Sequence, residues 1–162
     1  WFFVEAAPDL AQLIRQARQV NDGQPAYVVE KLHAHFGDLR GKTFAALGVT
    51  YKPNVDDMRE SPAVEVIHLL REAGAKVRVF DPYITDAPEL AGLFTESVLA
   101  AATRVDALLL LVHHREFLRM DTAALSKVVK QQVILDTRNV LSRPEWEAAG
   151  FEVLVLGNGK VT

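Results

Sequence analysis

The sequence predicts an α/β fold, with a parallel β-sheet flanked by helices and preceded by a helical segment. From residue 42 onward, short apolar runs alternate with stretches of helical periodicity, and this alternation is typical of right-handed βαβ units. The apolar runs are nearly continuous, as expected for strands that are covered on both faces. The part of the chain before residue 37 shows helical periodicity only. The sheet is therefore expected to begin after it.

The first helical stretch is expected at residues 9–20. Its apolar side chains recur at helical spacing: Leu10, Leu13, Ile14 and Ala17. The sequence Asn-Asp-Gly-Gln-Pro at residues 21–25 interrupts this pattern or restarts it, since proline is acceptable in the first turn of a helix. A second apolar stripe then leads to Gly37, the expected C-cap. The members of that stripe are Val28, Val29, Leu32 and Phe36.

Strands and helices are expected to alternate in the remainder of the chain. The expected strands are residues 43–50, 76–80, 107–113, 133–136 and 152–156. The expected helices are residues 62–73, 95–102, 122–130 and 143–149. The first of these helices begins at Ser61-Pro62, because serine is a favoured N-cap and proline is pre-organised for the first helical position. Gly74 ends it.

The loop between the first strand and this helix holds a cluster of charged residues: Lys52, Asp56, Asp57 and Arg59. In open α/β sheets, ligands bind outside the carboxyl ends of the strands. The start of a helix also presents free backbone N–H groups that suit an anion, and the two cations add positive charge beside them. We therefore expect an anion-binding loop. The alternative is a solvated loop in which the aspartates and the arginine merely pair with each other.

Composition narrows the classes of partner. The 162 residues, 49% hydrophobic and 24% charged, suit one globular domain with an appended element. The longest fully apolar run, residues 107–112, is too short to span a bilayer, so no membrane partner is expected. A net charge of −3 with scattered Lys and Arg argues against a nucleic-acid partner. Because cysteine is absent, the chain itself provides neither disulfides nor thiolate chemistry.

Two kinds of site are not expected in this chain. Gly48 is the only glycine in the turn after the first strand, so the G-x-G-x-x-G dinucleotide fingerprint is missing there. No metal site is expected, because Asp56 and Asp57 lack a third ligand at plausible spacing. The histidines are interpreted as local structure, since the members of each close pair point in different directions: His33 with His35, and His113 with His114.

Several motifs occur together along the chain. The string Tyr-Lys-Pro-Asn-Val-Asp-Asp-Met-Arg-Glu-Ser-Pro-Ala begins at Tyr51 and closely resembles the signature of the UDP-glucose/GDP-mannose dehydrogenase family, in its C-terminal UDP-sugar-binding domain. Further matches follow the family's order: Asn21-Asp22 with Pro25, Phe80-Asp-Pro-Tyr83 and Asp136-Thr-Arg-Asn139. The opening Trp1-Phe-Phe-Val4 looks most like the branch that acts on UDP-N-acetyl-D-mannosamine.

The resemblance implies that residues 1–37 are part of a central helical dimerisation region, and that residues 38–162 form a Rossmann-like UDP-sugar-binding domain. The parent protein would be a cytoplasmic NAD-dependent dehydrogenase that forms a homodimer or higher homo-oligomer. It would oxidise the C6 alcohol of UDP-N-acetyl-D-mannosamine to a carboxylate in two hydride transfers, for polysaccharide biosynthesis. In this family, the catalytic cysteine precedes the residues that match Trp1, and a separate domain holds the principal NAD site. The chain is thus expected to be an inactive fragment without catalytic residues.

The resemblance also implies roles for four residues. Tyr51 and Lys52 match residues that contact the UDP-sugar. Arg138 matches an arginine that contacts the UDP-sugar bound by the neighbouring subunit, and a guanidinium can hold phosphate through two parallel hydrogen bonds. A structural ion pair with Asp136 is the alternative for Arg138. Arg59 matches an arginine that reaches the NAD side of the cleft.

Other interpretations remain open at this point. The parent protein could be a UDP-glucose 6-dehydrogenase of the same family. It could also be a stand-alone nucleotide-binding regulatory module, such as a receiver-like domain. A receiver-like domain expects a phospho-acceptor aspartate at the end of the third strand, where this chain has Val112-His-His114. The amino-terminal helical segment could pack on its own domain instead of joining two subunits. Asp56 and Asp57 are expected to orient Arg59.

Overall fold

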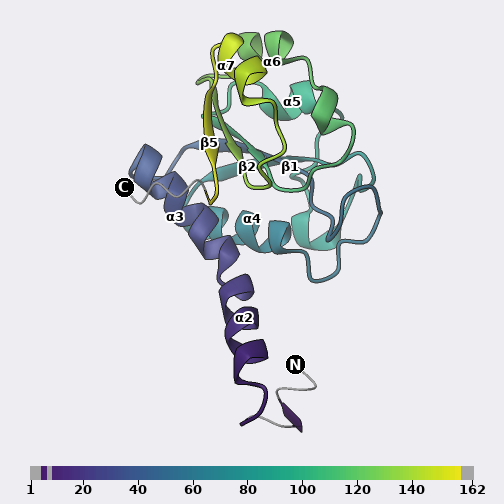
Figure 1. Ribbon diagram of the computed structural model, residues 1–162. Coiled ribbons are helices and arrows are strands. Elements are labelled where there is room, and N and C mark those ends of the chain that lie inside the picture. Colours follow the sequence, from purple (N-terminus) through teal and green to yellow (C-terminus); the bar gives the residue numbers. More distant parts are fainter. Residues whose placement is uncertain (1–4, 7–8, 158–162) are drawn as a thin grey trace.

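A five-stranded parallel sheet forms the centre of the computed structural model, which describes residues 5–6 and 9–157 (Figure 1). The strands are β1 (Thr43–Leu47), β2 (Lys76–Phe80), β3 (Ala107–Leu110), β4 (Val133–Asp136) and β5 (Glu152–Val155). Their order across the sheet is β2-β1-β3-β4-β5, and every neighbouring pair is parallel. The predicted α/β fold is confirmed. In this order the winding reverses between β1 and β3, which is where an open α/β sheet places its ligand.

Helices cover both faces of the sheet. The helices are α2 (Gln12–Asp22), α3 (Gln24–Phe36), α4 (Pro62–Glu72), α5 (Val98–Ala102), α6 (Thr122–Val128) and α7 (Arg143–Ala148), with the 3₁₀ turns η1 (Pro88–Leu90) and η2 (Phe117–Arg119). The helices α3 and α4 lie on one side of the sheet, and α5, α6 and α7 lie on the other (Figure 1).

The side chains of each strand alternate between two apolar cores. In β3, Leu109 faces the core that includes Leu32 of α3 and Ile67 of α4. Its neighbour Leu108 faces the other core, together with Trp146 of α7. Every side chain of β3 is buried, which explains why this segment reads as one continuous apolar run rather than as an alternating pattern. Burial of each such leucine favours folding by roughly 1.5–3 kcal/mol.

Some elements are shorter than the sequence predicts, because local hydrogen bonds end them. The helix expected from residue 95 begins only at Val98, since Thr95 is held beside β2 by its N–H, which donates to the Val79 carbonyl at 2.9 Å. The Ser97 hydroxyl then caps α5 by accepting from the Ala100 N–H at 3.1 Å. Similarly, the helix expected to reach residue 130 ends at Val128, and the Lys130 N–H bonds the Val105 carbonyl instead.

The helix α2 extends away from the α/β domain (Figure 1). None of its side chains is buried, whereas α3 contributes Val28, Val29 and Leu32 to the core. The apolar stripe expected on the first helix is therefore solvent-facing here, with Leu10 90% and Leu13 81% exposed. The Trp1-Phe-Phe-Val4 motif lies outside the described residues. Within residues 5–6 and 9–157, no helix combines the length and apolarity that a membrane crossing requires.

Candidate functional site

A cavity of about 250 Å³ lies at the carboxyl edge of the sheet, beside the point where the winding reverses. Its lining comes from the loop after β1, the start of α4, the residues after β3 and β4, and the last turn of α2: Asn21, Thr50, Tyr51, Lys52, Pro53, Ser61, Pro62, Ala63, Leu111, Val112 and Arg138. The cavity is lined by Tyr51, Lys52 and Arg138, the three residues predicted to bind substrate. Arg138 was expected to reach the substrate of a neighbouring copy, and here it lines a cavity of its own copy. The three residues come from two turns that are far apart in sequence, so only the parallel sheet places them side by side.

Lys52 and Arg138 give this cavity a positive character. Neither side chain forms an ion pair within the described part of the chain. The ammonium nitrogen of Lys52 lies 5.8 Å from the centroid of the Tyr51 ring, which is a cation–π contact. Two uncompensated cations and an aromatic face in one cavity suit a ligand that carries both an anionic group and a flat ring.

The carboxylate of Asp136 is occupied by backbone groups. It is buried and accepts from the N–H groups of Arg138 at 2.9 Å, Val140 at 2.8 Å and Leu141 at 2.9 Å. These bonds shape the turn after β4 and leave the Arg138 side chain exposed. The alternative of an ion pair between Arg138 and Asp136 is not seen in the structure. Asp136 instead sets the backbone from which Arg138 extends.

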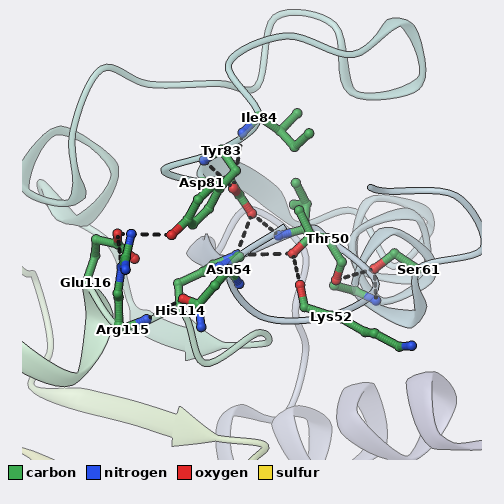
Figure 2. A network of polar contacts seen from close by, with 12 residues as sticks. Thr50, Lys52, Asn54, Ser61, Asp81, Tyr83, Ile84, His114, Arg115 and Glu116 are labelled. Carbon is green, nitrogen blue, oxygen red and sulfur yellow. Dashed lines mark hydrogen bonds and ion pairs between the residues drawn. The ribbon is translucent and has the colours of Figure 1, made fainter. Parts of the chain in front are cut away.

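A buried pair of side chains, Asp81 and His114, holds the backbone of the loop between β1 and α4 (Figure 2). Both side chains are fully buried, and the His114 Nε2 lies 3.0 Å from the Asp81 Oδ2. The same carboxylate oxygen accepts from the Val49 N–H at 2.7 Å, and the Oδ1 accepts from the N–H groups of Tyr83 at 2.8 Å and Ile84 at 3.2 Å. Burial raises the pKa of Asp81, but the hydrogen bonds from His114, Val49 and Tyr83 outweigh it and hold the pKa below its ordinary value.

The contacts of His114 define which ring nitrogen carries the proton. Its Nδ1 lies 2.9 Å from the backbone N–H of Asn54, so it must accept. The proton therefore resides on Nε2, which donates to Asp81 and lies 3.2 Å from the Thr50 hydroxyl oxygen. The Thr50 hydroxyl donates its own proton to the Lys52 carbonyl at 2.8 Å. Each polar side-chain atom of this network has a partner.

Further bonds fix the rest of the loop. The Tyr51 N–H donates to the Asp57 carbonyl at 2.8 Å, closing the loop on itself. The Ser61 hydroxyl accepts from the Ala63 N–H at 3.3 Å and donates to the Thr50 carbonyl at 3.1 Å, so the N-cap of α4 also ties the helix to the loop. Asn54 has a φ of +62°, and its Oδ1 accepts from the Arg115 N–H at 3.0 Å. Asparagine tolerates this left-handed geometry better than most residues.

Arg59 pairs with Asp57 at the outer side of the loop. Its Nε and one terminal nitrogen donate to the two carboxylate oxygens at 2.9 Å and 2.7 Å. The predicted orientation of Arg59 by an aspartate is therefore seen for Asp57, and Asp56 shows no such contact in the described chain. Arg59 does not line the cavity that holds Lys52 and Arg138. Its side chain is 88% exposed, so the described chain leaves it free to meet another molecule.

The Asp57–Arg59 pair has a pH signature. The side-chain hydrogen bonds from Arg59, together with its backbone N–H, lower the pKa of Asp57 from 3.8 to about 2. We expect the Asp57 carboxyl to titrate near that value in carboxyl-carbon NMR, and Arg59→Ala to return its pKa toward 3.8. Because the folded pKa is the lower one, the pair favours folding above pH 4 and loses that contribution as pH falls toward 2. An unchanged Asp57 pKa in Arg59→Ala would contradict the contact.

The other sequence-based interpretations can be placed on the structure. The His33 Nδ1 lies 3.0 Å from the Gly37 carbonyl oxygen at the end of α3, which is a local contact. His113 keeps a buried Nδ1 without a partner in residues 5–6 and 9–157. Burial, then the Arg138 charge, lower the pKa of His113. Among the described residues, no group of three or more potential ligands is arranged to hold a metal ion.

Sequence reasoning missed how Asp81 and His114 cooperate. Both were noted, Asp81 within the Phe80–Tyr83 motif and His114 as local structure, but 33 residues separate them. The available signal was positional. Each follows directly or closely after a strand that neighbours β1, so both side chains reach the same sheet edge beneath the loop.

Comparison with known proteins identifies related sequences. Residues 45–143 match the family model described as "UDP-glucose/GDP-mannose dehydrogenase family, UDP binding domain". The chain is 42% identical to the UDP-N-acetyl-D-mannosamine dehydrogenase of Methanocaldococcus jannaschii, over 99% of this chain and 37% of that protein. It is 35% identical to the UDP-glucose 6-dehydrogenase TuaD of Bacillus subtilis, over 86% of this chain and 31% of that protein. The chain therefore spans about a third of the length of these relatives.

Solved structures agree with the sequence matches. The UDP-N-acetyl-mannosamine dehydrogenase Cap5O from S. aureus superposes with a TM-score of 0.79 at 30% identity, over 97% of this chain and 36% of that one. The likeness extends over almost the whole chain, so it includes the helical segment as well as the α/β domain.

Proposed function

This chain belongs to the UDP-glucose/GDP-mannose dehydrogenase family, and we propose that it is the UDP-sugar-binding portion of an NAD-dependent UDP-sugar 6-dehydrogenase. One observation carries the proposal. Tyr51, Lys52 and Arg138 share a cavity at the carboxyl edge of the sheet. In this assignment, the diphosphate is bound by Lys52 and by an Arg138 of the same copy or of a neighbouring one, and Tyr51 contributes a flat apolar surface. The supporting geometry is that both cations reach the cavity without an ion-pair partner in the described chain.

Calorimetric titration with UDP tests this assignment. We expect Lys52→Ala and Arg138→Ala each to weaken UDP binding by about ten- to a hundredfold, because a hydrogen bond to a charged group contributes roughly 1.5–3 kcal/mol. Lys76→Ala is the matched control, since Lys76 is exposed and begins β2 at the opposite end of the sheet. It should leave binding unchanged. Equal effects of all three substitutions would mean that only net charge matters, and would contradict a specific diphosphate site.

The proposed sugar is N-acetyl-D-mannosamine. Support comes from the relative that is 42% identical over 99% of this chain and bears that activity in its name. The UDP-glucose 6-dehydrogenase TuaD, at 35% identity, supports glucose as the second candidate. Oxidation of UDP-N-acetyl-D-mannosamine to its uronate would supply polysaccharide biosynthesis in the cytoplasm. A screen of the full-length protein against UDP-N-acetylmannosamine, UDP-glucose, UDP-N-acetylglucosamine and GDP-mannose would distinguish these substrates.

The described residues do not fit a principal NAD site. The turn after β1 has Gly48 as its only glycine and leads into a long loop, residues 49–61, rather than directly into a helix. We propose that NAD is bound elsewhere in the parent enzyme and that Arg59 contacts it from the edge of the loop. Because the chain has no cysteine, covalent trapping of an aldehyde by a thiolate also requires residues outside it. The chain alone is therefore proposed to be inactive.

The exposed face of α2 is proposed to contact a second copy of the chain, within the helical dimerisation region assigned to residues 1–37. An apolar stripe this exposed is stabilised when another surface covers it. We expect Leu13→Asp to shift a dimer toward monomer in size-exclusion chromatography with light scattering. Arg15→Asp is the control for added acidity on the same helix, since Arg15 lies outside the apolar stripe. If both substitutions leave the mass unchanged, α2 does not carry the subunit contact.

A further inference from the structure

We propose that His114 is a positioning residue for the loop of residues 49–61, called the UDP-binding loop here. It acts through its Nδ1, which accepts a hydrogen bond from the loop backbone. The inference builds on the proposed function for its ligand, but its structural part can be tested without any ligand. His114 lies under the loop and does not line the cavity. Whatever it contributes to binding must therefore pass through the backbone of the loop that carries Lys52 (Figure 2).

The first step is the anchor on Asn54. The Nδ1 of His114 accepts the Asn54 N–H at 2.9 Å, and Asn54 has a φ of +62°. Asparagine tolerates this left-handed region better than most residues, and a bond to its N–H stabilises it there. The histidine supplies the acceptor for that bond from the core, because its own side chain is fully buried. It packs at 5.0 Å from Tyr83 and 5.5 Å from Phe117, measured between ring centroids.

The second step connects the same ring to Lys52. The His114 Nε2 lies 3.2 Å from the Thr50 hydroxyl oxygen, which in turn donates to the Lys52 carbonyl at 2.8 Å. One imidazole thus fixes the loop on both sides of Lys52, through Thr50 before it and Asn54 after it. Asp81 accepts from Nε2 and so selects the tautomer in which Nδ1 is an acceptor. The loop conformation depends on this tautomer.

The charged and phenolic groups around the ring come from the turn after β2 and from the residues that follow His114. Asp81 lies at the end of β2, and Tyr83 in the turn after it donates to Glu116 at 3.2 Å. Arg115 pairs with Glu116 at 3.2 Å. Of the charged groups, the Asp81 carboxylate is the only one that contacts the imidazole within the described chain, whereas Tyr83 packs against the ring. The role of Asp81 is to orient the ring, and the role of the ring is to orient the loop.

Two substitutions distinguish the contributions of the two ring nitrogens of His114. In His114→Asn, the amide oxygen occupies the position of Nδ1 and can still accept from Asn54. In His114→Gln, the amide nitrogen occupies the position of Nε2 and can still donate to Asp81, but the acceptor for Asn54 is lost. Both variants lose the ring, and each loses one of its polar contacts: His114→Asn the donor to Asp81, and His114→Gln the acceptor for Asn54. We expect each variant to weaken UDP binding about tenfold, the value of one hydrogen bond, because each releases the loop on one side of Lys52.

Amide hydrogen exchange without ligand provides the second readout. The Asn54 amide should exchange about tenfold faster in His114→Gln than in His114→Asn, at matched global stability. Equal Asn54 exchange in the two variants, or an unchanged UDP affinity in both, would overturn the proposal. If Asn54 exchange differs as expected but the unaltered chain binds no UDP, the positioning role stands and the proposed function fails. The two failures are therefore distinguishable.

If His114→Gln does not fold, a milder substitution provides a second test. Thr50→Val removes only the hydroxyl that links His114 to the Lys52 carbonyl. It should weaken UDP binding about tenfold. Thr103→Val is its matched control, because the Thr103 hydroxyl also donates to a backbone carbonyl, that of Leu99, at 2.8 Å but at the end of α5. Equal UDP affinities in Thr50→Val and Thr103→Val would contradict the proposal.

Discussion

Replacing Asp81 with alanine should lower the free energy of unfolding by about 3–5 kcal/mol, because it removes the shared acceptor of two buried and two partly buried donors. The carboxylate binds the His114 imidazole and the backbone N–H groups of Val49, Tyr83 and Ile84. Without it, the donors of Val49 and His114 are buried and unpaired where the turns after β1 and β2 meet. Urea denaturation followed by circular dichroism measures the change.

Asp121→Ala is the matched control for that result. Asp121 is also an aspartate that accepts a backbone N–H, that of Ala124 at 2.9 Å, but it is an exposed N-cap of α6. Its loss should cost about 1 kcal/mol. If Asp81→Ala costs no more than Asp121→Ala, the buried network does not stabilise the fold as described.

The contribution of Asp81 also has a definite pH dependence. Its pKa is lowered in the folded chain, since hydrogen bonds outweigh burial. Its carboxylate therefore favours folding fully above the ordinary value of 3.8 and progressively less as pH falls through the lower folded pKa. The stability difference between the unaltered chain and Asp81→Ala should accordingly shrink below pH 4.

Replacing Gly48 with alanine should destabilise the chain by about 2–5 kcal/mol, through backbone strain and overpacking. Gly48 has a φ of +87°, and a Cβ built on it would lie 2.6 Å from the Val112 Cβ and 2.9 Å from the Val112 carbonyl oxygen. The close approach occurs where the turns after β1 and β3 meet, directly beside the cavity. Even a partly relaxed variant should bind UDP more weakly, because Val112 lines that cavity.

Gly92→Ala separates the two causes. Gly92 has a similar φ of +76°, but a Cβ added there would meet nothing within 4 Å among the described residues. It should therefore incur only the backbone strain, about 1–2 kcal/mol. Thermal unfolding of both variants measures the difference. A loss in Gly48→Ala no larger than that in Gly92→Ala would show that Val112 yields easily, and that the turn is not tightly packed.

The α/β fold was predictable because its signals are local. The continuous apolar run at β3 and the Ser61-Pro62 start of α4 each indicate their structure without reference to distant residues. The start of α5 and the end of α6 were not predictable from local signals. They are determined by backbone hydrogen bonds to Val79 and Val105, which are distant in sequence. The central part of a helix or strand can be predicted from its own residues. Its first and last residues depend on which backbone groups of neighbouring segments are available for hydrogen bonding.

The candidate site divides in the same way. Lys52 and Arg138 were identifiable from their motifs, and the structure places both at one cavity. The buried contact between Asp81 and His114 was not identified, because it depends on three strands being adjacent in a particular order. The periodicity of the residues around Asp81 or around His114 does not indicate the order of the strands in the sheet.

The most direct test of the proposed site is a structure of this chain bound to UDP. We expect the diphosphate within hydrogen-bonding distance of the Lys52 ammonium group and an Arg138 guanidinium, whether from the same copy or from a second one. The Asn54 N–H should remain bonded to His114. A diphosphate bound away from both cations, for example in the neighbouring cavity lined by Arg18, Glu60 and His68, would contradict the central claim.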